Sequence, residues 1–129
     1  MTPFKETISD VDLRPSPIHG QGLFTKRHRA EGEVLTRLGG EVVPHGGDLE
    51  FLLSHEWNSL SAEMILLRRE WTSYGFINHA RPANLRITLG DHSLLAACAI
   101  SAGEELTLDY AEHGIPEIYL TSDAGAYLR

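Results

Sequence analysis

Hydrophobic residues in the first third of the chain occur in short pairs that glycine and proline separate. Leu23-Phe24 and Val34-Leu35 are such pairs, and turn-forming residues stand close to each of them. Because glycine and proline at this density interrupt helices, the pattern favours short β-strands. We predict strands over 22–25 and 33–36, within an N-terminal part that covers 11–43.

A helical pattern replaces these pairs over 44–70. Asp48 can cap a helix whose apolar face is formed by residues at helical spacing, namely Leu49, Leu52, Leu53 and Trp57. The apolar run 64–67 fits either a buried strand or a second helix, because so short a run has no distinctive period. We therefore expect a helical insertion in which the second element is either a strand or a helix. Both tryptophans, Trp57 and Trp71, are expected in the core.

Alternating and turn-rich sequence returns over 71–110 and is followed by a short tail, 111–129. Alternation predicts a strand over 85–89, and a more buried strand is expected over 93–100. The last strand and a short tail helix are expected over 105–110 and 116–120. Short strands at intervals of about 8–12 residues are typical of a mostly β protein. The length of 129 residues suits a single domain, 1–129.

Cysteine content limits the chemistry that the chain can perform. Cys98 is the only cysteine, so an internal disulfide framework and a cysteine-rich zinc site are both excluded. No metal site is predicted. Cys98 lies within the apolar run 94–100, and free cysteines in such runs are usually buried. We therefore expect a buried thiol.

The charge balance bears on partners. The net charge of −7 argues against direct nucleic-acid binding, which needs a positive surface. An acidic surface favours a basic partner, although solubility alone also explains it. No stretch approaches the roughly 20 apolar residues of a membrane helix. The first residues also lack the basic-then-apolar pattern of a secretory leader. A cytoplasmic protein without membrane association is expected.

Three segments contain residues suited to ligand chemistry. In 16–24, a Gly-x-Gly would let a ligand approach the backbone closely, although a plain tight turn explains it as well. Phe76-Ile77-Asn78-His79, with Asn84 downstream, offers the donors and acceptors that an adenine edge requires, but would also suit a polar turn. In 103–110, Tyr110 stands at the end of an expected strand, which on its own could be an amphipathic edge strand.

In their order and spacing these segments resemble the SET domain. That family has an early Gly-x-Gly, an inserted region, a hydrophobic-Asn-His segment with a downstream Asn, and a final Gly-Glu-Glu-Leu-Thr-x-Asp-Tyr. The chain contains all of these between 11 and 110. The resemblance implies a β-clip of small curved sheets, with a threaded, knot-like C-terminal segment and a short helical insertion.

The resemblance also implies a function: a protein-lysine N-methyltransferase that uses S-adenosyl-L-methionine and acts on a basic protein. Tyr110 would be the catalytic residue. The substrate pocket would be lined by Leu108, Tyr74 and Ile87. The cofactor would be bound by Gly20, Gln21, Gly22, Leu23, Asn78 and His79. Methyl transfer to a neutral amine needs alignment more than proton transfer, so no histidine is expected to act as a general base.

The chain also departs from the family pattern. The sequence over 80–84 is Ala-Arg-Pro-Ala-Asn, where the family usually has Ser-Cys-x-Pro-Asn, and Gly75 stands where the family often has Arg. The cysteine cluster that often follows the domain is absent, so Tyr119 or Tyr127 could close the site instead. A catalytically inactive SET-fold interaction module, an unrelated β-rich binding domain and a homodimer remain alternatives.

Overall fold

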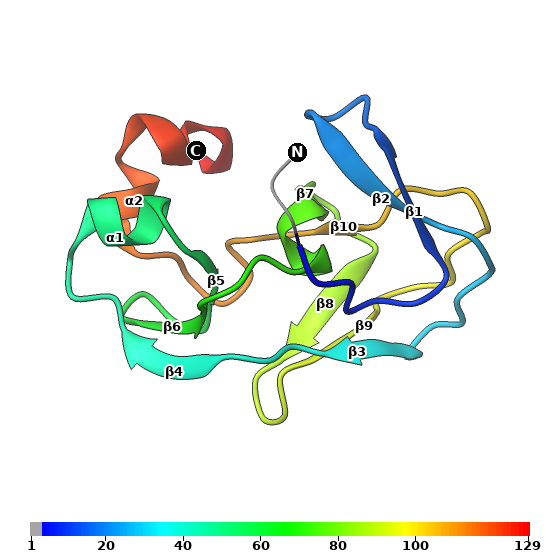
Figure 1. The fold of residues 1–129 in the computed structure, drawn as a ribbon, viewed down its shortest axis with the longest axis horizontal. Coiled ribbons are helices and arrows are strands. Elements are labelled where there is room, and N and C mark those ends of the chain that lie inside the picture. The colour runs from blue at the N-terminus through cyan, green and yellow to red at the C-terminus, as the bar shows by residue number, and fades with distance from the viewer. Residues whose placement is uncertain (1–3) are drawn as a thin grey trace. The chain divides into compact units, whose positions relative to one another are not determined.

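The computed structural model describes residues 4–129, which form short β-strands with a few helical turns (Figure 1). The strands are β1 (Val11–Pro15), β2 (Gln21–Thr25), β3 (Val34–Arg37), β4 (Glu41–Pro44), β5 (Glu56–Ser59), β6 (Met64–Arg68), β7 (Asn78–His79), β8 (Leu85–Thr88), β9 (Ser93–Ala96) and β10 (Thr107–Leu108). The α-helices are α1 (Leu49–Leu53) and α2 (Glu117–Leu120), and the 3₁₀ helices are η1 (Ser73–Phe76) and η2 (Asp123–Leu128). The prediction of a mostly β protein with short helices is confirmed.

The chain divides into two compact units. The first combines the chain up to Leu38 with Thr72–Asp109. The second combines Gly39–Trp71 with Tyr110–Arg129. Each unit is described by itself.

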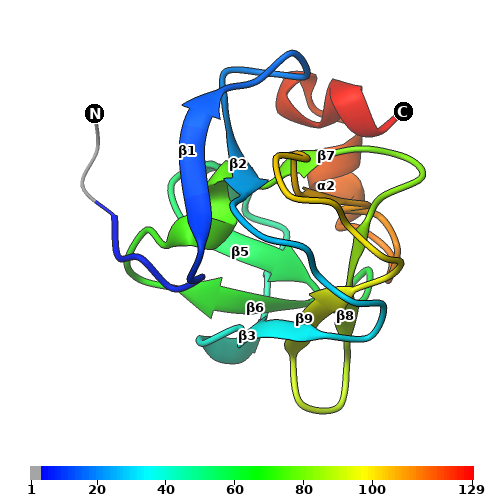
Figure 2. The same cartoon turned by 90° about the vertical axis from the view of Figure 1, so that its right-hand side faces the viewer.

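The first unit contains a two-stranded hairpin. Strand β1 runs antiparallel to β2, from the pair Val11 and Thr25 to the pair Pro15 and Gln21 (Figure 2). The amide of Ser16 donates a hydrogen bond of 2.7 Å to the carbonyl of Gly20, which closes the turn. Gly20 has a φ of +46°, a conformation that side chains disfavour, so the glycine here serves the turn.

The second sheet of this unit has the strand order β3-β9-β8-β10-β7. Strands β8 and β9 form an antiparallel hairpin, and β3 pairs with the outer side of β9. Strand β10 lies between β7 and β8 and is parallel to both. Because β7 and β8 follow each other in the sequence, a later segment separates two strands that a simple hairpin would pair.

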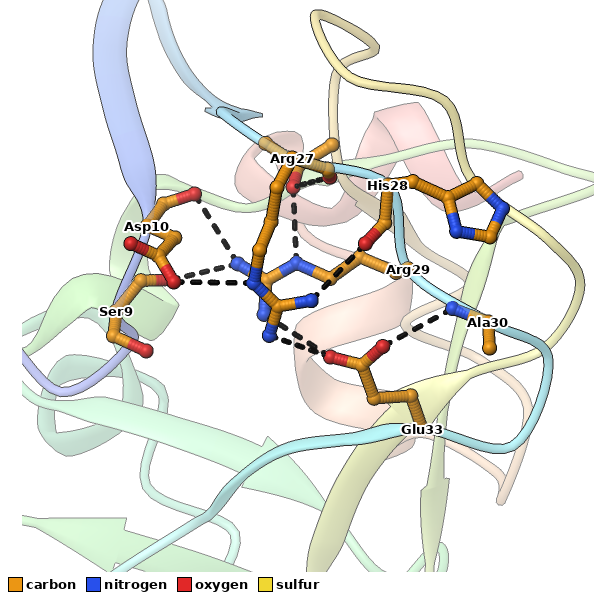
Figure 3. Close-up of polar contacts among 8 residues, drawn as sticks. Ser9, Asp10, Arg27, His28, Arg29, Ala30 and Glu33 are labelled. Carbon is orange, nitrogen blue, oxygen red and sulfur yellow. Dashed lines mark hydrogen bonds and ion pairs between the residues drawn. The ribbon is translucent and has the colours of Figure 1, made fainter.

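A buried arginine connects the start of this unit to its centre (Figure 3). The side chain of Arg29 is 1% exposed. Its guanidinium donates to the carbonyls of Ser9 at 2.7 Å and Asp10 at 3.2 Å, and to the hydroxyl of Thr25 at 2.9 Å. The Glu33 carboxylate lies 3.6 Å away and supplies a counter-charge. Burial, followed by the charge of Arg27, lowers the pKa of Arg29.

The second unit has its own sheet and core. Strand β6 lies between β4 and β5 and is antiparallel to both. Helices α1 and α2 lie side by side (Figure 1). The core residues are Leu52, Ile65 and Leu67, with Val43, Phe51, Trp57 and Tyr119 packed around them.

Several sequence predictions for single elements are confirmed. The strand over 22–25 lies within β2, and Asp48 caps α1 by accepting a hydrogen bond of 3.1 Å from the Phe51 amide. The ambiguous run 64–67 is a strand, β6. None of the helices in residues 4–129 is long and apolar enough to cross a membrane.

Other predictions are wrong, several of them because elements end early. Helix α1 stops at Leu53, so Trp57 belongs to β5, where its indole donates 2.8 Å to the Leu52 carbonyl. Strand β9 stops at Ala96, and Cys98, expected to be buried, lies in the exposed bend that follows. Trp71, expected in the core, is 43% exposed. The last strand is confined to Thr107–Leu108.

Candidate functional site

The Asn78 amide brings the three sequence segments together within the first unit. Its Nδ2 donates to the carbonyls of His19 at 3.0 Å and Gln21 at 3.1 Å. The same nitrogen lies 2.9 Å from Oε2 of Glu105. Since these contacts join residues far apart in the sequence, the Gly-x-Gly turn, the Asn-His strand and the Glu-Glu segment form one structural cluster.

Glu105 is the anionic centre of this cluster, and sequence reasoning did not single it out. Its two carboxylate oxygens each lie 2.8 Å from the Ser16 hydroxyl. The neighbouring amide of Leu106 donates 2.8 Å to the carbonyl of Leu23, which ties this segment to β2. The doubled acid of the Gly-Glu-Glu segment was the available signal, but nothing in the sequence indicates which acid points inward.

The two glycines of the Gly-x-Gly have different roles. A Cβ on Gly22 would lie 2.3 Å from Oε2 of Glu105, so a larger residue here would have to displace that carboxylate. At Gly20 no atom lies within 4 Å of a Cβ position. A ligand could therefore approach the backbone at Gly20, whereas the Glu105 carboxylate occupies the space beside Gly22. Gln21, between them, is exposed, whereas Leu23 is buried.

His79 lies on β7, the outermost strand of its sheet. It is opposite Leu108, and the Ala80 amide donates 3.2 Å to the Leu108 carbonyl. In a parallel strand pair, a residue such as Leu108 forms its backbone hydrogen bonds with the two residues on either side of its partner. The peptide groups of His79 therefore point to the outer edge of the sheet.

The His79 ring has an electrostatic environment of its own. Its Nδ1 lies 3.9 Å from the Asp109 carboxylate, and Arg81 makes a 3.2 Å contact with the same oxygen. Burial lowers the pKa of His79, Arg81 lowers it further, and Asp109 opposes both. The imidazole is therefore neutral at physiological pH, which suits a packing group.

The three residues predicted to line a substrate pocket all lie in the first unit and are buried. Leu108 is on β10 and is 2% exposed, Tyr74 is on η1 and is 4% exposed, and Ile87 is on β8 and is 5% exposed. All three side chains are part of the buried core of this unit.

Tyr110, predicted to be catalytic, is the first residue of the second unit after Asp109. The rings of Tyr110 and Tyr127 meet edge to face with centroids 6.3 Å apart. The Tyr127 hydroxyl lies 2.9 Å from that of Tyr119. Burial and this hydrogen bond raise the pKa of Tyr127. Both tail tyrosines named from the sequence thus belong to one aromatic cluster with Tyr110.

The first unit also has a cavity of about 200 Å³ beside its hairpin. Of the residues predicted to bind the cofactor, only Leu23 lines it. Its lining mixes apolar and charged side chains: Phe4, Glu6, Ile8, Ser9, Asp10, Val11, Leu13, Leu23, Lys26 and Ser73. Over 4–129, no three His, Cys, Asp or Glu side chains gather as a metal site would require.

The sequence matches no model of a protein family, and a search of the curated proteins gave no match.

Proposed function

We propose that this protein is an S-adenosyl-L-methionine-dependent protein-lysine N-methyltransferase with a SET-type fold. The observation that supports the proposal is the convergence at Asn78, whose amide contacts the Gly-x-Gly turn and the Glu-Glu segment. The position of β10 between β7 and β8 agrees with the threaded C-terminal segment that the resemblance implies.

The residues around Asn78 fit the parts of the proposed cofactor. The amide nitrogen of Asn78 is used within the protein, which leaves its Oδ1 as an acceptor for an ammonium group such as that of the methionine moiety. His79, on the strand at this edge of the sheet, would lie beside the adenine, as the resemblance implies. Gly20 and Gln21 would contribute backbone contacts on the exposed turn. The bound cofactor would supply an electrophilic methyl group on a sulfonium.

The remaining chemistry concerns the lysine. A free lysine has a pKa near about 10.4, so the site must favour its neutral form before it can attack. An apolar pocket disfavours the ammonium ion, and buried residues such as Leu108 and Ile87 provide that environment. The Tyr110 hydroxyl would align the amine by a hydrogen bond. Positioning of this kind accounts for catalysis without a general base.

The charge of the chain is consistent with a basic protein substrate. With a net charge of −7, the surface attracts lysine-rich segments and accelerates encounter with them. The charge does not select among basic proteins. Gel filtration would distinguish a monomer from a homodimer.

The test combines binding and transfer. Calorimetric titration with S-adenosyl-L-methionine should show saturable binding, and labelled cofactor should transfer methyl groups to lysines of basic proteins. Tyr110→Phe should abolish transfer and retain cofactor binding. Thr121→Val is the control, because it removes an exposed hydroxyl, bonded to the Glu117 carbonyl, from the same unit. Equal transfer by the two variants would reject the catalytic assignment of Tyr110.

One observation favours the alternative of an inactive interaction module. The Asn78 nitrogen has three acceptors within the protein, so its first role is to hold the fold together. If the wild-type chain binds no cofactor but still captures a basic peptide, the interaction module is the correct interpretation.

A further inference from the structure

Asn78 can face its neighbours with only one end of its amide. All three groups around Nδ2 are acceptors, namely the carbonyls of His19 and Gln21 and the carboxylate of Glu105. Only the NH₂ end of an amide can donate, so the nitrogen points inward and Oδ1 points the opposite way. Since Glu105 is the charged acceptor, it makes the strongest of these interactions.

Glu105 also holds both ends of the turn over residues 16–22. The Ser16 hydroxyl lies 2.8 Å from both carboxylate oxygens, and the Ile18 amide donates 3.0 Å to the same hydroxyl. On the other side, the carboxylate fills the space where Gly22 lacks a Cβ. One side chain thus holds the start of the turn, its end and the Asn78 amide.

From these contacts we infer that Glu105 is a positioning residue for cofactor binding, an inference that depends on the proposed function. Glu105 orients Asn78 so that Oδ1 faces the ligand, and it keeps the Gly20–Gly22 backbone in place. Glu105 acts through these groups and does not itself react. Its loss should weaken cofactor binding and leave the rate of the bound complex nearly unchanged.

Two substitutions at this position separate geometry from charge. Glu105→Ala removes every contact of the carboxylate. Glu105→Gln can retain them, because its amide oxygen accepts from Asn78 while its NH₂ donates to the Ser16 hydroxyl. We expect Glu105→Ala to raise the Kd and KM for S-adenosyl-L-methionine about tenfold with little change in kcat, as loss of charge-assisted hydrogen bonds implies. Glu105→Gln should restore most of the affinity.

Glu104→Ala is the matched control. It removes the same charge from the adjacent residue, whose carboxylate accepts 2.6 Å from the Ser101 amide and belongs to a different turn. Equal affinity in Glu105→Ala and Glu104→Ala would overturn the inference and leave the proposed function standing. A wild-type protein without cofactor affinity would instead reject the proposed function, and the cofactor role of Glu105 with it.

Hydrogen exchange measured without ligand tests the structural part independently. Amides of residues 16–22 should exchange faster in Glu105→Ala than in Glu104→Ala. A Cβ at position 22 must displace the carboxylate, so Gly22→Ala should produce the same loosening. The amides of the variant that combines Glu105→Ala with Gly22→Ala should therefore exchange little faster than those of either single variant. Additive effects, or unchanged exchange, would show that Glu105 does not organise this turn.

Discussion

Asn84 and Thr107 are joined by reciprocal hydrogen bonds between their backbones and side chains. The Asn84 amide donates 3.1 Å to the Thr107 hydroxyl, and the Thr107 amide donates 2.8 Å to Oδ1 of Asn84. The Asn84 side chain also donates 2.8 Å to the Glu105 carbonyl. One asparagine thus holds the chain entering β10 beside the start of β8.

Replacement of Asn84 by alanine should therefore destabilise the fold. Asn84→Ala leaves the partly buried Thr107 amide and Glu105 carbonyl without these partners, at a cost of about 2 kcal/mol in the free energy of unfolding. Urea unfolding monitored by circular dichroism would measure it. Arg86→Ala, at an exposed position on β8, is the control and should change stability little. Equal midpoints for the two variants would contradict this role of Asn84.

Arg29 should be among the most sensitive positions outside the candidate site. Arg29→Ala removes the donors that bond the Ser9 and Asp10 carbonyls and leaves a buried space. We therefore expect the free energy of unfolding to fall by about 3 kcal/mol or more. Arg29→Lys keeps the charge but loses the planar guanidinium, so its stability should lie between those of wild type and Arg29→Ala.

Arg27→Ala is the matched control for this cluster, because its exposed guanidinium binds Asp10 and Glu33 from the solvent side (Figure 3). Exposed ion pairs contribute little to stability, so this variant should unfold close to wild type. Comparable losses at Arg27 and Arg29 would show that burial is not what makes Arg29 important.

The sequence predicted local structure better than pairing between distant segments. The capped start of α1 at Asp48 and the strand at 22–25 follow from neighbouring residues, and both were found. The run 94–100 is uniformly small or apolar, and only its pairing shows that the strand stops before Cys98. Pattern alone cannot indicate where a strand loses its partner.

The candidate site shows the same limit. Asn78 was recognisable from its motif, but its partners, the carbonyls of residues 19 and 21, have no sequence signature. Glu105 was missed because the sequence does not distinguish it from Glu104, and only the fold shows that Glu105 contacts Ser16 while Glu104 caps a different turn. The position of β10 between β7 and β8 has no local sequence signature, because it depends on pairing between distant segments.

His79 predicts a specific pH dependence of stability. Its pKa in the folded state lies below the ordinary value of 6.5, mainly because of burial. As the pH falls through 6.5, the unfolded state takes up a proton before the folded state does, so stability declines. Urea unfolding at about pH 7.5 and about pH 5.5 should therefore show a larger loss for wild type than for His79→Gln.

Neighbouring charges provide a directional check on His79. Asp109→Asn should lower the pKa of His79 further, because the carboxylate favours the imidazolium. Arg81→Ala should raise it, because a like charge is removed. Titration of the imidazole by NMR would measure both shifts. Shifts in the same direction would contradict the assignment of these two neighbours.

Leu108 predicts which methylation states the proposed enzyme reaches. The family often has an aromatic residue at this position, whereas here a buried leucine lies on β10 opposite His79 and Leu85. In the proposed enzyme, a side chain without a ring or hydroxyl would leave a wider, drier lysine pocket, so we expect a mass-spectrometric time course to pass beyond monomethyl-lysine. A wild-type reaction that stalls at monomethyl-lysine would contradict this prediction.

A larger residue at position 108 should narrow that pocket. Leu108→Phe is expected to shift products toward monomethyl-lysine, at a stability cost of about 1–3 kcal/mol from overpacking. Leu94→Phe makes the same volume change at a fully buried position on β9 and should reduce stability without changing the product ratio. Because both variants strain the core, only a shift in product distribution specific to position 108 supports a role in the lysine pocket.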